Sequence, residues 1–73
     1  MNLDQFHIGD TVRIDTIDLD TAAQHRLRAL GMIPGTKVTI LHKKHTGTMV
    51  IDLRGTRFAL GSQMSRQIGG THA

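Results

Sequence analysis

The chain has 73 residues, too few to build two hydrophobic cores, so the sequence predicts one domain spanning residues 1–73. It contains no cysteine, which excludes disulfides and thiolate-bound zinc and leaves apolar packing to stabilise the fold. Nine Lys and Arg residues against six acidic residues give a net charge of +3, which admits an acidic protein, a nucleic acid or an anionic membrane as a partner.

Other features of the composition narrow these partner classes. The only aromatic residues are Phe6 and Phe58, so the chain lacks the stacking platforms that single-stranded nucleic-acid binders commonly use. No stretch approaches the ~20 apolar residues needed to span a bilayer, and residues 1–5 lack the features of a signal peptide. We therefore expect a cytoplasmic domain with a protein partner, no membrane insertion and no bound nucleic acid.

The first predicted elements are a strand and a helix. After a Gly-Asp turn signal, apolar Val12 and Ile14 alternate with polar residues, and this period of two predicts a half-buried strand. Residues 22–30 carry apolar side chains at i, i+4 and i+7, which predicts a short amphipathic helix. We expect Leu27 and Leu30 to pack this helix against the strands.

Strong signals delimit the helix. Asp20 or Thr21 can cap its first amides, because both side chains carry an oxygen that accepts a hydrogen bond. Gly31 stands where a left-handed residue commonly ends a helix. Pro34 and Gly35 suit the two central positions of a type II turn, so a new strand should begin directly after them.

The rest of the chain is predicted to be mostly strand. Residues 37–42 and 49–53 form two strands joined by a polar, basic loop. Arg54 and Gly55 separate the second of these from residues 56–60, and a two-residue connection containing Gly indicates a tight hairpin. The remaining expectations are a 3₁₀ turn, a last strand and a flexible tail, at residues 61–64, 65–68 and 69–73.

Five short strands with one helix after the first predict an all-β fold, a small antiparallel barrel whose closure would leave no open strand edge. The run Leu-x-x-Leu-Gly-Met-Ile-Pro-Gly at residues 27–35, followed at once by a β-rich segment, resembles the signature of the FeoA family. The resemblance covers nearly the whole chain. It implies an SH3-like fold and a cytoplasmic role, peripheral to the inner membrane, beside FeoB, the ferrous-iron permease whose cytoplasmic part includes a GTP-binding domain.

The sequence contains no recognisable catalytic or metal-binding motif. It has no nucleophilic cysteine and no phosphate-binding glycine loop, so we expect neither an enzyme nor a bound cofactor. Five histidines are scattered without the spacing of a metal site. Two alternatives stay open: a small nucleic-acid-binding β-barrel or regulatory domain, and an iron chaperone. The sequence also leaves self-association open.

The candidate partner-binding residues lie in two stretches of the chain. The end of the helix and the loop after it combine positive charge with two apolar side chains that so short a span rarely buries together. The stretch before the third strand is the densest run of positive charge. These residues are Arg26, Arg28, Met32, Ile33, Lys43 and Lys44. Two other interpretations compete with partner binding: the apolar pair packs in the core, and the charged side chains simply face water. If the apolar pair does bind a partner, we expect Met32→Asp to weaken binding and leave the fold intact.

Overall fold

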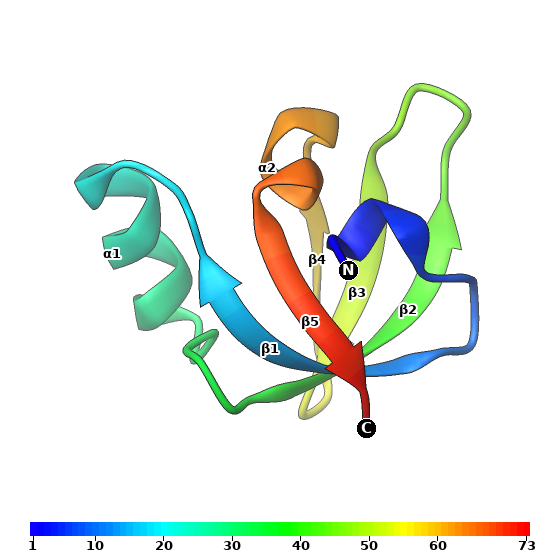
Figure 1. Cartoon of the computed structure of the whole chain (residues 1–73), viewed down its shortest axis with the longest axis horizontal. Helices are drawn as coiled ribbons and strands as arrows, with labels where there is room; N and C mark the ends of the chain where they lie inside the picture. Colours follow the sequence, from blue (N-terminus) through cyan, green and yellow to red (C-terminus); the bar gives the residue numbers. More distant parts are fainter.

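The computed structural model describes all 73 residues and contains five strands and three short helices (Figure 1). The sheet is antiparallel throughout, with strand order β4-β3-β2-β1-β5. The elements in chain order are η1 (Leu3–Gln5), β1 (Thr11–Ile17), α1 (Thr21–Ala29), β2 (Lys37–Lys43), β3 (Met49–Leu53), β4 (Thr56–Leu60), α2 (Ser62–Arg66) and β5 (Ile68–His72). The predicted arrangement of five antiparallel strands with one helix between the first and second is confirmed.

The core is built from the inward faces of the curled sheet. Val12 and Ile14 of β1 are fully buried while their neighbours face water, which confirms the alternation predicted for this strand. Leu27 is the residue by which α1 reaches the same cluster, and Phe6 closes it from the N-terminal side. No disulfide is present, so this single apolar cluster of 13 buried residues stabilises the domain.

The sheet is not closed by hydrogen bonds, because β4 and β5 are its two edges and do not pair with each other. The predicted closure is therefore wrong in this respect. The N-terminus covers the β5 edge instead: Met1 and Gly70 exchange hydrogen bonds at 2.8 and 3.2 Å, and Asn2 forms a bridge with Gly69. The chain passes from β4 to β5 through the short helix α2 (Figure 1).

The prediction for the C-terminus is wrong. The expected tail forms most of β5, which pairs with β1. A short helix, α2, occupies much of the segment predicted as a 3₁₀ turn and last strand. A Cβ added to Gly70 would lie 2.5 Å from Val12 Cγ1 and 2.6 Å from the Arg13 carbonyl oxygen. Only glycine fits so close to β1. Gly69 and Gly70 therefore lower the strand propensity of this segment, but their small size permits β5 to pair with β1.

The central strands match their predictions closely. β3 and β4 have the predicted bounds, and Arg54 and Gly55, with φ of 52° and 88°, form the predicted tight hairpin between them. β2 extends one residue further than predicted, to Lys43. An irregularity between Ile40 and His42 interrupts the alternation of β2, so His42 is exposed although Ile40, two residues earlier, is buried.

Candidate docking surface

Helix α1 is anchored at its start by the residues that precede it. Asp20, one of the two predicted caps, accepts a hydrogen bond from the Ala23 amide at 2.7 Å. The side-chain amide of Gln24 donates to the carbonyls of Ile17 and Leu19 at 3.2 and 2.8 Å. These bonds tie the first turn of α1 to the end of β1, so the helix has a defined position against the sheet.

The end of α1 is equally well defined. Gly31 has a φ of 94°, and its amide donates to the Arg28 carbonyl at 2.9 Å. The Met32 amide donates to the Leu27 carbonyl at 2.9 Å, which completes the two hydrogen bonds of a Schellman motif. This motif brings the residues at its two ends into apolar contact, and Leu27 and Met32 are both buried in the core cluster. The predicted helix stop at Gly31 is confirmed.

A buried threonine that the sequence analysis did not single out holds the loop after α1. The Thr36 hydroxyl donates to the Gly31 carbonyl at 3.3 Å and accepts from the Ile33 amide at 3.4 Å. The backbone on either side is tied to β1: the Gly35 amide donates to the Ile14 carbonyl at 2.7 Å, and the Ile14 amide to the Thr36 carbonyl at 2.8 Å. The loop is therefore rigid. Its only sequence signal is a hydroxyl residue directly after the Pro-Gly turn.

The structure divides the predicted apolar pair. Ile33 is 45% exposed, whereas Met32 is 1% exposed and belongs to the core, so Met32 is withdrawn from the predicted contact surface. Leu30, which was expected to pack inward, is the C-cap of α1 and is also 45% exposed. The apolar surface at this end of the molecule therefore consists of Leu30 and Ile33, on either side of the buried Met32.

A small hollow adjoins Ile33, between α1, the end of β1 and the loop. Its volume is about 130 Å³. The residues that line it are Ile17, Gln24, Arg28, Met32, Ile33 and Pro34. We define the α1-loop surface as Arg28, Leu30, Ile33 and Pro34, all of which are exposed.

The two predicted arginines of α1 are not equivalent. Positions two apart on a helix point to widely different directions, and only Arg28 lines the hollow beside Ile33. Both side chains are exposed, and neither forms an ion pair with a carboxylate. The structure therefore places Arg28, but not Arg26, beside the predicted apolar residue.

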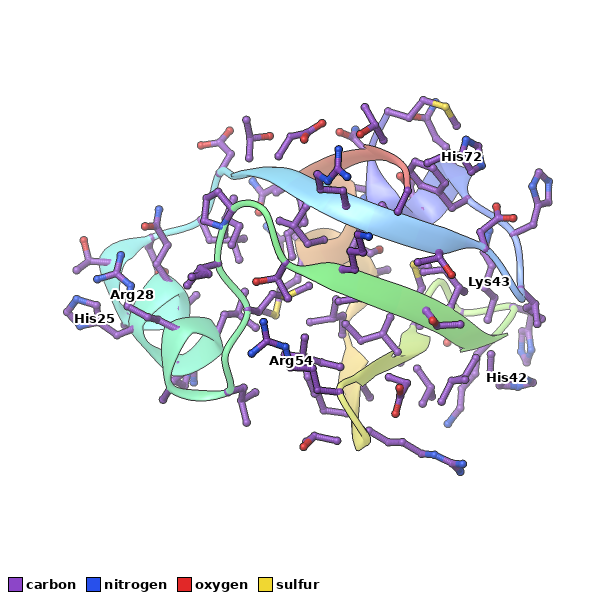
Figure 2. All side chains as sticks on the ribbon, turned by 90° about the horizontal axis from the view of Figure 1, so that it is seen from below. His25, Arg28, His42, Lys43, Arg54 and His72 are labelled. Atoms are coloured by element: carbon purple, nitrogen blue, oxygen red, sulfur yellow. The ribbon has the colours of Figure 1, made fainter.

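The predicted basic stretch lies at the other end of the molecule and has a different character. The Lys43 ammonium group donates to the carbonyls of Asp4 and Phe6 at 3.0 and 2.8 Å, so it joins β2 to the N-terminal segment. Lys44 is exposed and begins the β2–β3 loop, residues 44–48. Figure 2 shows Lys43 and α1 at opposite ends of the sheet. The six predicted residues therefore do not form one surface.

The β2–β3 loop borders a second hollow, of about 220 Å³. Its lining residues are Asp4, His45, Thr46, Gly47, Ser62, Ser65 and Arg66. No hydrophobic residue lines it, so this hollow lacks the apolar contacts that usually anchor a protein partner.

The histidines are spread over the molecule, with His25 on α1 and His42 and His72 at the far end (Figure 2). No group of three or more His, Cys, Asp or Glu side chains is placed to hold a metal ion. Asp10 accepts a hydrogen bond from the His7 amide at 2.8 Å, and its Oδ2 lies 3.5 Å from His72 Nε2. The His7 amide, and next the His72 side chain, hold the pKa of the Asp10 carboxyl below its ordinary value near 3.8.

No helix in the structure has both the length and the apolar content that a membrane crossing requires.

Solved structures of FeoA proteins have a similar fold. The solution structure of FeoA from Chlorobium tepidum superposes with a TM-score of 0.91 at 20% identity, covering 99% of this chain and 70% of that one. The Stenotrophomonas maltophilia FeoA, solved with zinc and described as a prokaryotic SH3 domain protein, gives a TM-score of 0.80 at 25% identity, covering 97% and 89%. A manganese-dependent transcriptional repressor gives 0.88 at 19% identity, covering all of this chain and 41% of the repressor. The predicted SH3-like fold is confirmed.

The family of the chain is evident from its amino-acid sequence. No protein of curated function matches the chain. The family model of the FeoA domain matches residues 1–71, which is nearly the whole chain and includes both the α1-loop surface and the strands that carry it. The resemblance seen at residues 27–35 is therefore part of a match along the full domain, and the chain belongs to the FeoA family, which is linked to ferrous iron transport.

Proposed function

We propose that the protein is a cytoplasmic accessory of ferrous-iron uptake that binds the cytoplasmic part of a FeoB-type permease and modulates its assembly, GTP turnover or gating. The observation that carries this proposal is the α1-loop surface, where Leu30 and Ile33 are each 45% exposed on a rigid backbone. Docking through this surface would keep the protein peripheral to the inner membrane. The protein acts by binding, because neither hollow contains a recognisable catalytic arrangement.

The energetics of such a contact favour the rigid loop. Full burial of a Leu or Ile side chain contributes about 1.5–3 kcal/mol, and the exposed fractions of Leu30 and Ile33 leave somewhat less than half of that to be gained on docking. The hydrogen bonds of Thr36 and Gly35 already order the loop, so binding incurs little further conformational entropy. Two apolar side chains on a rigid support can therefore anchor a modest, reversible complex.

Of the partner classes compatible with a net charge of +3, a nucleic acid is less well supported than a protein. Both aromatic rings are used in packing, since Phe6 is fully buried and Phe58 packs against the core from β4. The chain therefore offers no fully exposed Phe, Tyr or Trp ring for a base to stack on. A salt titration separates the two classes, because phosphate binding weakens steeply with added salt whereas apolar docking does not.

The proposal is tested by titrating the protein into the purified cytoplasmic part of a FeoB-type permease, with heat of binding and GTP hydrolysis as readouts. We expect saturable binding, and we expect Ile33→Asp to weaken it by about tenfold or more, since the variant buries a charge in an apolar contact. Ile8→Asp is the matched control: Ile8 is 57% exposed and belongs to the segment between η1 and β1, which Figure 1 shows at the end of the sheet away from α1.

Equal affinities for the wild type, Ile33→Asp and Ile8→Asp would remove the α1-loop surface from the interaction. The absence of any binding by the wild-type protein would overturn the proposed function. Thermal unfolding of both variants shows whether a lost interaction reflects a lost fold.

A further inference from the structure

Arg54 occupies a conformation that its side chain disfavours. It is the only non-glycine residue of the chain with a positive φ, 52°, and Gly55 follows with a φ of 88°. These are the two central positions of the β3–β4 hairpin, where Asn, Asp and Gly are preferred because they tolerate a left-handed backbone. Turn geometry therefore does not account for an arginine at this position.

Contacts within the fold do not supply that explanation. The turn receives its side-chain hydrogen bond from another residue, since the Gly55 amide donates to Asp52 Oδ2 at 3.5 Å. The guanidinium group of Arg54 forms neither a hydrogen bond nor an ion pair within the chain, and the side chain is exposed. Arg54 thus carries a free positive charge on a rigid two-residue turn.

The hairpin lies next to the loop after α1. A Cβ built on Gly31 would lie 3.6 Å from Cδ2 of Leu53, the residue before Arg54. Figure 2 shows this loop between the labelled side chains of Arg28 and Arg54. The exposed apolar residues of the loop, Leu30 and Ile33, are therefore flanked by positive charge from two separate elements.

We propose that Arg54 is a specificity-determining residue of the α1-loop surface, and that this surface recognises a partner segment in which an apolar side chain is flanked by carboxylates. The inference rests on the proposed function and names the chemistry of the segment that docks. The apolar side chain covers Leu30 and Ile33, while the carboxylates meet Arg28 on one side of the loop and Arg54 on the other. Guanidinium groups suit this role because their planar donors bind a carboxylate with two parallel hydrogen bonds.

Arg54→Asn distinguishes a binding role of Arg54 from a structural one, because a binding role predicts that the variant gains stability and loses affinity, whereas a structural role predicts that it loses stability. Asn is favoured in the turn, so we expect the melting temperature to rise by about 2–5 °C. We expect the affinity for the cytoplasmic part of a FeoB-type permease to fall about five- to tenfold, and to depend less on salt than that of the wild type. Lys44→Asn is the matched control, since it removes one exposed positive charge at the other end of the molecule and should change affinity less than about twofold.

Each outcome is decisive. Unchanged affinity of the more stable Arg54→Asn variant would overturn the inference and leave the proposed function standing. An equal loss for Arg54→Asn and Lys44→Asn would also overturn it, since net charge alone would then explain the effect. The absence of binding by the wild-type protein would overturn the proposed function and the inference with it.

Discussion

The two ends of this small domain both carry positive charge, but they use it differently. At one end, Arg28 and Arg54 are free of partners and stand beside two exposed apolar residues. At the other end, the Lys43 ammonium group is held by two backbone carbonyls, and no hydrophobic residue lines the adjoining hollow. The first end combines the features of a docking surface, whereas the second uses charge to secure the N-terminal segment. A basic run in a sequence is therefore weak evidence for a binding site until the partners of its charges are known.

The largest effect that would test this contrast is expected at Met32. The sequence interpretation treated Met32 as a contact residue and expected Met32→Asp to fold normally. Since the side chain is 1% exposed, the variant places a carboxylate in the core, and we expect it to destabilise the domain by more than about 3 kcal/mol. Circular dichroism during urea or thermal unfolding measures this loss. A fully folded Met32→Asp protein would contradict the assignment of Met32 to the core, and Ile33→Asp, which should stay folded, is the control.

An intermediate effect is expected at Lys43. Lys43→Met keeps the aliphatic stem and removes the ammonium group, which leaves the carbonyls of Asp4 and Phe6 without their donor. We expect a loss of roughly 1.5–3 kcal/mol in the free energy of unfolding, the range typical of hydrogen bonds to charged groups. Lys44→Met should change stability by no more than about 0.5 kcal/mol. Equal stability of the two variants would mean that the Lys43 ammonium group is solvated like that of Lys44 and does not secure the N-terminal segment.

The smallest effect concerns pH. Because folding lowers the pKa of the Asp10 carboxyl, its ionised form contributes stability above its ordinary value near 3.8, and this contribution disappears as the pH falls through the lower, folded-state pKa. Unfolding of wild type and Asp10→Asn should therefore differ most above pH 4 and converge at more acidic pH. A difference that grows on acidification would contradict the direction of the shift. The α1-loop surface should be unaffected, since Asp10 lies at the other end of β1.

Much of the fold follows from local signals in the sequence. The bounds of β3 and β4, the hairpin at Arg54 and Gly55, and the stop of α1 at Gly31 each depend on residues within a few positions of one another. Turns and helix caps can be predicted without the rest of the molecule, because their geometry is determined by the backbone preferences of the residues involved.

The errors concern features that depend on distant contacts. Gly69 and Gly70 predicted a tail because glycine weakens a strand, yet their small size lets β5 approach β1. Periodicity placed Leu30 on the inner face of α1, but the Schellman turn that ends the helix directs Met32 into the core and leaves Leu30 exposed. The proposed contact surface therefore stays at the predicted loop, with Leu30 in place of Met32.

The grouping of the candidate site could not be predicted for the same reason. Residues 26–33 and 43–44 are both basic stretches, and only the sheet topology shows that they lie at opposite ends (Figure 2). The sequence identified Arg54 only as part of a tight turn, because nothing local indicates that the β3–β4 hairpin lies beside the loop after α1.

The most direct test of the docking account is a map of backbone amide shifts in the ¹⁵N-labelled protein during titration with the cytoplasmic part of a FeoB-type permease. We expect the largest changes at residues 28–35 and at the hairpin around Arg54, with residues 44–48 unchanged. Changes centred on residues 44–48, with the loop after α1 undisturbed, would contradict the claim that the protein binds through the α1-loop surface.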